Sequence, residues 1–190
     1  MSSHSRNSRK ATQALHLAFA AALLAGSAAQ AAQAADQPHN FELAAFSNTL
    51  AGDSLVRGNY EAAFQQLAID EHSLTASPAT IATNRCVTLI MTHKFEEAHT
   101  ACNSAVSAAR LEIVSMPVSV AWARQEFRDY LALAYSNRAV LDYLTNDTTA
   151  AQADLAKAKS VSPKAELVAR NLTVLQSHNA VAQVAVVPKS

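Results

Sequence analysis

A helical hairpin pattern occurs twice in this chain, about 53 residues apart, and constrains the fold more than any other feature. In both copies a residue that begins a helix is followed by alanines three and ten residues later. These positions are Phe95, Ala98 and Ala105 in the first copy, and Thr148, Ala151 and Ala158 in the second. A fainter copy lies upstream at Tyr60 and Ala63. Because each such unit must bury its apolar face against the next, the pattern predicts stacked antiparallel helical hairpins.

The composition supports an all-α fold in one domain. The chain has 190 residues, half of them apolar, with only three glycines and five prolines. Abundant alanine favours helix over sheet. Small residues at matching positions would let facing helices approach closely; these are Ala51, Cys86 and Ala139 in the first helices and Ala63, Ala98 and Ala151 in the second.

Hydrophobic periodicity and turn residues predict where the helices lie. We expect a helical domain over residues 41–178. Its helices are expected at 41–57, 60–73, 78–93, 95–115, 118–145, 148–161 and from Ser162-Pro163 to about Ser177. A polar linker, 35–40, should precede this domain, and a tail, 179–190, is expected to be disordered.

The first 34 residues have the order of a secretory signal peptide. Arg6, Arg9 and Lys10 precede an apolar stretch, and small residues with Ala-x-Ala spacing follow it. The apolar core is too short to span a bilayer comfortably. We therefore expect cleavage between about Ala31 and Ala35, a periplasmic or secreted product, and no stable membrane insertion after cleavage.

Removing this leader changes the charge of the chain. The leader takes three basic and no acidic residues from the 15 of each, which leaves a net charge of −3. No basic cluster remains, so nucleic acid is not an expected partner.

The three hairpins resemble the tetratricopeptide repeat, a helix–turn–helix unit of about 34 residues with an aromatic, two alanines and a closing proline at these positions. The resemblance covers about Phe46 to Pro163 and implies a short right-handed superhelix of about three degenerate repeats. The match is loose in places: Asp70 replaces an alanine, and Thr148 replaces the aromatic residue. The interval from Phe95 to Thr148 is about 19 residues too long, which could lengthen two helices rather than insert a loop.

Two cysteines, Cys86 and Cys102, remain after the leader, and an even number in an exported protein favours a disulfide. If they occupy facing positions, they bridge the two helices of the middle hairpin. Free thiols and a metal site that includes His93 and His99 are the alternatives. The usual zinc spacings are absent, so we expect neither metal nor cofactor.

The Asn-Arg pairs at 84–85 and 137–138 occupy equivalent positions. The asparagines could hydrogen-bond a peptide backbone in a concave groove. Alternatively they satisfy neighbouring backbone groups, while the arginines pair with carboxylates such as Glu97 or Asp154. The resemblance implies that first-helix positions line the groove, and the partner-binding candidates are Thr83, Asn84, Val87, Ser136, Asn137, Val140 and Tyr143.

No catalytic motif accompanies these features: the chain has no Gly-x-Ser-x-Gly, phosphate-binding loop or His-Glu-x-x-His. We therefore expect a non-enzymatic protein that binds a protein or peptide segment, as a scaffold or assembly factor. One alternative is self-association, for example as a homodimer through apolar residues of the last helix and the tail. The other is a metal or redox protein that uses Cys86, His99 and Cys102.

Overall fold

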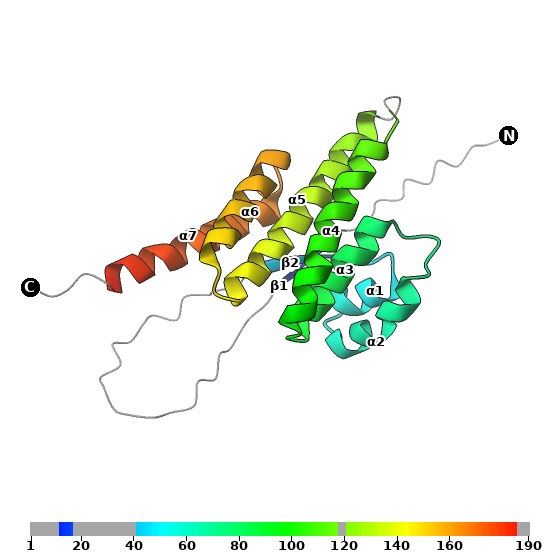
Figure 1. Cartoon of the computed structure of the whole chain (residues 1–190), viewed down its shortest axis with the longest axis horizontal. Coiled ribbons are helices and arrows are strands. Elements are labelled where there is room, and N and C mark those ends of the chain that lie inside the picture. The colour runs from blue at the N-terminus through cyan, green and yellow to red at the C-terminus, as the bar shows by residue number, and fades with distance from the viewer. Residues whose placement is uncertain (1–11, 17–40, 118–120, 186–190) are drawn as a thin grey trace, which may run out of the picture.

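A computed structural model describes residues 12–16, 41–117 and 121–185. These residues form seven α-helices and two short strands (Figure 1). In chain order the elements are β1 (Thr12–His16), β2 (Glu42–Phe46), α1 (Leu50–Val56), α2 (Tyr60–Asp70), α3 (Pro78–Met91), α4 (Phe95–Ser115), α5 (Ala121–Leu144), α6 (Thr148–Val161) and α7 (Glu166–Ala185). The all-α class is confirmed, and helices that are neighbours in sequence pack together.

The three hairpins, α1–α2, α3–α4 and α5–α6, share one kind of turn. Each turn contains a residue with positive φ two positions before the second helix: Gly58 at 75°, His93 at 57° and Asn146 at 66°. Glycine adopts this left-handed conformation without steric cost, and asparagine tolerates it better than most residues. The recurrence shows that the three hairpins are equivalent units, as the sequence pattern predicts.

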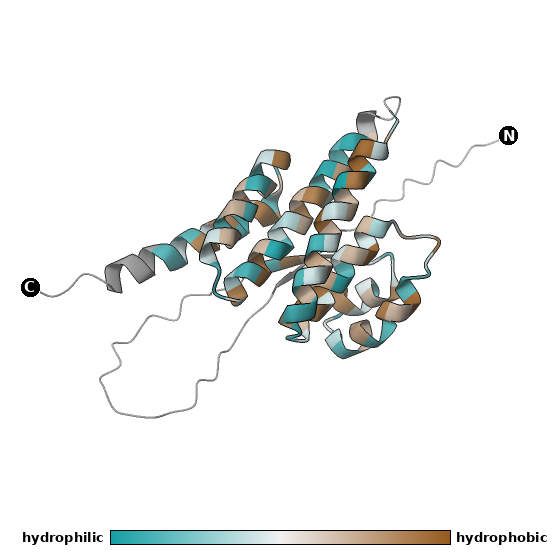
Figure 2. Cartoon of the chain, viewed as in Figure 1, coloured by the Kyte–Doolittle hydropathy of each residue, from teal (hydrophilic) through white to brown (hydrophobic). Residues whose placement is uncertain are grey.

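The small residues that recur in the sequence form the seams between the helices. Each of them is buried, and the larger side chains one turn further along are buried as well; the set is Ala51, Ala63, Leu67, Cys86, Ala98, Cys102, Ala139, Ala151 and Leu155. The helices carry hydrophilic residues alongside these apolar ones (Figure 2), as expected for helices with one buried face. Short side chains at the seams let the helix axes approach, so the core is built from close contacts rather than large aromatic rings.

The predicted disulfide is present. Cys86 on α3 and Cys102 on α4 are fully buried and bonded to each other, with their Cα atoms 4.7 Å apart. The bond joins the two helices of the middle hairpin, as facing positions in the seam allow.

Replacing Cys86 and Cys102 together by alanine is expected to lower the free energy of unfolding by about 3 kcal/mol, because it frees a loop whose ends are 16 residues apart. Urea unfolding followed by circular dichroism measures the change. Dithiothreitol should lower the midpoint of the wild type and leave that of the double variant unchanged. Equal midpoints for the double variant and the oxidised wild type would contradict the prediction.

The extra length between Phe95 and Thr148 lies in two long helices, the second helix of the middle hairpin and the first helix of the last. α4 has 21 residues and α5 has 24, whereas α3 and α6 have 14 each. The excess therefore extends this helix pair beyond its neighbours, which Figure 1 shows as the projecting end of α4 and α5.

The prediction of one helix over residues 41–57 is wrong for its first part. Residues 42–46 form β2, and the helix begins only at Leu50. Thr49 ends the extended segment, because its side chain accepts a hydrogen bond from the Gly52 amide and caps α1. Ala and Leu allow a helix at 42–46, but contacts with distant helices hold this segment extended, as described below.

The last helix also differs from the prediction. It begins at Glu166 and continues to Ala185, beyond the expected end near Ser177, so residues 179–185 of the predicted tail are helical. The remaining tail, the linker 35–40 and the predicted leader, apart from the β1 backbone, lie outside the described residues. Within the described ranges, no helix is both long and apolar enough to cross a membrane.

Candidate functional site

An extended segment of the chain itself lies in the groove between α3, α5 and α7. β2 contacts α1, α3, α5 and α7, all of which place a face toward it. The strand lies between these helices in Figure 1 and is buried along its whole length. We call the faces of α3, α5 and α7 that hold β2 the groove.

Three asparagines, one from each groove helix, bind the backbone of β2 at alternate residues. Asn84 on α3 accepts a hydrogen bond from the Phe46 amide and donates to the Phe46 carbonyl, both at 2.8 Å. Asn137 on α5 makes the same pair with Ala44, at 2.8 and 2.9 Å. Asn171 on α7 does so with Glu42, at 2.8 Å in both directions. We call these three side chains the asparagine ladder.

The ladder works because strand and side-chain geometry match. Residues two apart in a strand are about 6.8 Å apart and direct their amide and carbonyl groups to the same edge. A carboxamide has an acceptor oxygen and a donor NH2 group side by side, so it pairs with a residue much as a neighbouring strand would. All three side chains are at most 1% exposed, so each pair satisfies backbone groups that water cannot reach. One edge of β2 is therefore sealed by side chains.

The other edge of β2 carries the amide and carbonyl groups of Leu43 and Ala45. β1 pairs there in antiparallel register, with Gln13 opposite Ala45 and Leu15 opposite Leu43. Because the groups at 42, 44 and 46 already face the ladder, these two pairs are the hydrogen-bonded ones. The main chain of β2 is thus held by side chains at one edge and by the main chain of β1 at the other.

Side chains anchor the two ends of β2. Glu42 accepts two hydrogen bonds from Arg170 on α7, at 2.7 Å each. The Glu42 side chain is buried, whereas the Arg170 side chain is partly exposed to solvent. The hydrogen bonds to the Glu42 carboxylate raise the pKa of Arg170 above its ordinary value. At the other end, the Phe46 ring lies 4.8 Å from the ring of Tyr130 on α5. These contacts add side-chain recognition to the main-chain bonds.

All seven partner-binding candidates predicted from the sequence belong to α3 or α5, the helices that contact β2. Asn84 and Asn137 hold the strand directly. Ser136 accepts a hydrogen bond from Asn171 Nδ2 at 2.9 Å and so orients a ladder residue. The Tyr143 ring lies 4.8 Å from the ring of Phe41, and burial raises the pKa of its hydroxyl. Thr83, Val87 and Val140 are buried in the same two helices.

The structure shows the asparagines of the two Asn-Arg pairs satisfying backbone groups of the same chain, although in the distant strand β2 and not in neighbouring segments. Binding of a separate peptide by these asparagines stays a prediction. Arg138 pairs with Asp154 as predicted, at 2.5 Å from Nε to Oδ2. Arg85 pairs with Glu71 and not with the expected Glu97.

Sequence reasoning missed the third ladder residue, Asn171. It follows Asn137 by 34 residues, whereas Asn137 follows Asn84 by 53, and it also neighbours an arginine. The order is reversed there, Arg170 before Asn171. The unequal spacing and the reversed order both hide the match to the other two pairs.

The residues named in the metal-site alternative make other contacts in the structure. Cys86 and Cys102 are bonded to each other, and His99 Nδ1 lies 4.0 Å from Asp142 Oδ1. In the described part of the chain, no three His, Cys, Asp or Glu side chains are grouped as a metal site would need.

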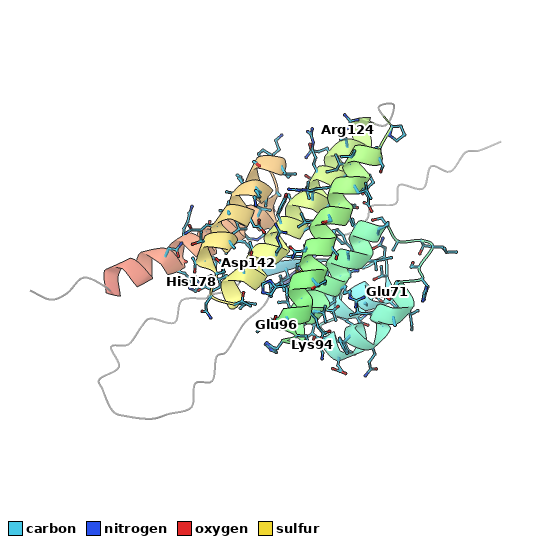
Figure 3. The ribbon with its side chains drawn as sticks, in the orientation of Figure 1. Glu71, Lys94, Glu96, Arg124, Asp142 and His178 are labelled. Atoms are coloured by element: carbon cyan, nitrogen blue, oxygen red, sulfur yellow. A yellow bond between two sulfur atoms is a disulfide. The ribbon has the colours of Figure 1, made fainter. Side chains whose placement is uncertain are left out.

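Asp142, labelled on α5 in Figure 3, has a pKa above its ordinary value. Burial of the carboxylate is the main cause, the nearby Asp154 carboxylate adds to it, and Arg138 and His99 oppose it. A carboxyl whose pKa is raised on folding stabilises the fold below its unfolded pKa, and this contribution is lost as pH rises through the folded pKa.

Replacing Asp142 by asparagine is therefore expected to raise the unfolding midpoint at pH 7, because the buried charge is removed. At a pH below the unfolded pKa, where the wild-type carboxyl is neutral in both states, the gain should disappear. Urea unfolding at pH 7 and pH 3 measures both values. A variant that is less stable than the wild type at pH 7 would show that the His99 and Arg138 attractions exceed the cost of burial.

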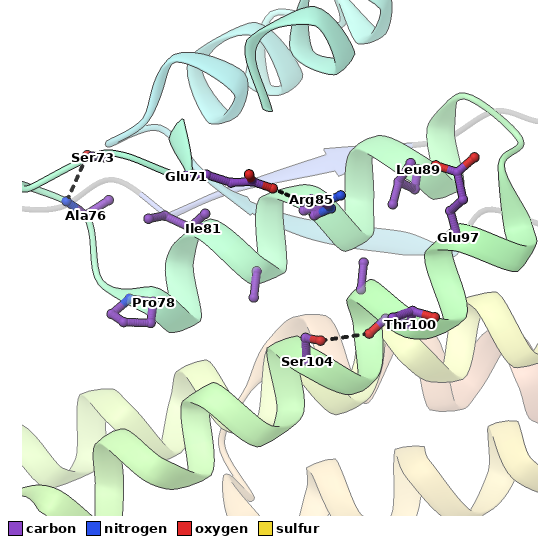
Figure 4. A pocket seen from close by; sticks show the side chains of 12 residues that line it. Glu71, Ser73, Ala76, Pro78, Ile81, Arg85, Leu89, Glu97, Thr100 and Ser104 are labelled. Carbon is purple, nitrogen blue, oxygen red and sulfur yellow. Dashed lines mark hydrogen bonds and ion pairs between the residues drawn. The ribbon is translucent and has the colours of Figure 1, made fainter. Parts of the chain in front are cut away.

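A surface cleft lies on another side of α3, between the end of α2 and α4 (Figure 4). Its volume is about 730 Å³, and apolar side chains, including Pro78, Ile81 and Leu89, form much of its lining. The Arg85–Glu71 ion pair closes one wall. The cleft contains none of the ladder residues, so it is separate from the groove.

Comparisons with protein-family models, with curated proteins and with solved structures find no match to this chain.

Proposed function

We propose that this protein is an exported interaction module that binds an extended segment of a protein or peptide, in a scaffold or assembly role. The observation that carries the proposal is the asparagine ladder. Helices α3, α5 and α7 each contribute one buried carboxamide that hydrogen-bonds the main chain of β2. Such contacts select extended backbone rather than a particular sequence, which is the chemistry of peptide recognition by main-chain hydrogen bonds.

The regular placement of the ladder supports a recognition role over simple core packing. Buried core positions in helices are normally filled by apolar side chains, since a buried carboxamide costs free energy unless every hydrogen bond is made. Here the cost recurs on three helices, at Asn84 of α3, Asn137 of α5 and Asn171 of α7. The tetratricopeptide resemblance adds support, because it implies that this concave face is the binding face.

Export is the second part of the proposal. A buried disulfide is typical of proteins that fold in an oxidising compartment, so the Cys86–Cys102 bond agrees with the signal-peptide pattern of the first 34 residues. The periplasm or the extracellular space is then the place to seek the partner.

Site-specific photo-crosslinking tests the binding role. A benzoylphenylalanine at Ser47, which is exposed immediately after β2, should crosslink one partner polypeptide in the extracytoplasmic fraction. The same group at Ser160, exposed on α6, is the matched control and should capture none. Equal capture at both positions, or none at Ser47, would contradict the proposed function.

A further inference from the structure

The second edge of β2 is covered only by β1 among the described elements. The ladder occupies the groups of residues 42, 44 and 46, and the amide and carbonyl groups of Leu43 and Ala45 point to the opposite edge. β1 covers that edge with five residues in antiparallel register. Residues 12–16 all lie within the predicted leader, so cleavage near residues 31–35 would remove the strand that covers Leu43 and Ala45.

β2 itself would remain in place when β1 leaves. The amide and carbonyl of Glu42, Ala44 and Phe46 are bonded to asparagines of α7, α5 and α3, and none of these bonds involves β1. The strand is also tied to α1, because Asn84 Nδ2 donates to Thr49 Oγ1 at 3.0 Å as well as to Phe46. A partner would have to break these bonds to replace β2, whereas adding to its second edge breaks none.

We propose that the processed chain binds an extended segment of a partner polypeptide by antiparallel strand addition to the Leu43–Ala45 edge of β2. The segment takes the position that β1 occupies in the full-length chain. An unpaired strand edge is a ready template for another strand, and main-chain hydrogen bonds supply the affinity. This inference rests on the proposed function and names its site and the conformation of the bound segment.

The edge can be opened in the full-length chain without removing any residue. Proline at Gln13 and Leu15 eliminates the two β1 amides that face β2, so Gln13→Pro with Leu15→Pro should release the strand. Ala14→Pro is the matched control, because the amide of residue 14 points away from β2 and proline is tolerated there. A chain with residues 12–16 replaced by glycine and serine is a second opened form, in case the prolines disturb folding.

The probe is a fluorescein-labelled synthetic peptide of residues 10–18, and its anisotropy reports binding. We expect saturable binding to the opened chains and none to the wild type or to Ala14→Pro. N-methylation of the peptide at both Gln13 and Leu15 should weaken binding about 30-fold, since two hydrogen bonds of about 1 kcal/mol each are lost. N-methylation at Ala14 should leave it unchanged.

Failure of either peptide experiment would overturn the inference. A folded opened chain that does not bind, or binding that ignores N-methylation, means that the edge is not the site. An opened chain that dimerises and excludes the peptide would show that a second copy pairs there instead. Crosslinking at Ser47 with no peptide binding rejects this inference alone, whereas peptide binding without a crosslinked partner rejects the proposed function.

Discussion

Replacing Asn137 by leucine is expected to lower the free energy of unfolding by about 4 kcal/mol. The leucine side chain has the same number of heavy atoms and the same branching, but it offers neither a donor nor an acceptor. The Ala44 amide and carbonyl, however, lose their partners at 2.8 and 2.9 Å in a fully buried site. Each buried main-chain group left unsatisfied costs roughly 1–3 kcal/mol. Urea unfolding followed by circular dichroism measures the loss.

Two further variants make the Asn137 result specific. Gln125→Leu, at an exposed position of the same helix, should change stability by no more than about 0.5 kcal/mol. Asn137→Asp places a carboxylate oxygen against the Ala44 carbonyl, which is destabilising at pH 7. At low pH the introduced carboxyl is neutral and can donate to that carbonyl, so this variant should recover stability relative to Asn137→Leu as pH falls. A pH-independent deficit would argue against the ladder geometry.

Replacing Gly52 by alanine is expected to destabilise the protein by roughly 4 kcal/mol, although alanine normally stabilises a helix relative to glycine by about 1 kcal/mol. A Cβ at this position would lie 1.8 Å from the Phe46 carbonyl oxygen and 2.3 Å from Asn84 Nδ2. Neither the Phe46 carbonyl nor the Asn84 amide can move away without breaking the hydrogen bond that joins them. The methyl group must therefore separate α1 from β2 and break the last rung of the ladder.

Gly58→Ala is the comparison for Gly52→Ala. Gly58 has a φ of 75°, and a Cβ there would meet only the Tyr60 hydroxyl at 4.0 Å, so its cost comes from backbone conformation alone. We expect about 1 kcal/mol for that change. If Gly52→Ala proves as stable as the wild type, α1 and β2 do not approach as closely as described. Urea unfolding midpoints of Gly52→Ala, Gly58→Ala and the wild type measure these differences.

The helices and their pairing could be predicted from the sequence because their signals are local. Phe95, Ala98 and Ala105 mark one helix by their spacing, and the left-handed residues Gly58 and Asn146 sit at recognisable turns. The Cys86–Cys102 bond is expected from the even number of cysteines in an exported chain, on the condition that the two positions face each other across adjacent helices. Each of these inferences needs only residues that are close in the chain.

Two of the three ladder residues could be predicted from the sequence, but the strand that they bind could not. Asn84 and Asn137 stand out as a repeated pair, and their groove position follows from the repeat. What they bind does not, because Phe46 and Ala44 lie 38 and 93 residues away from them in sequence. Asn171 bonds Glu42 across 129 residues. No local pattern links these positions.

The sequence alone therefore determined the helical units and their alanine seams, because spacing within a helix decides which side chains face a neighbouring helix. It also indicated the disulfide. Only the tertiary structure decided that residues 42–46 are extended. Their side chains would suit a helix, and local propensity favours one. The segment is a strand because helices α3, α5 and α7, once stacked, present three carboxamides at the repeat of an extended backbone, and a helix in that position would leave all three buried and unpaired.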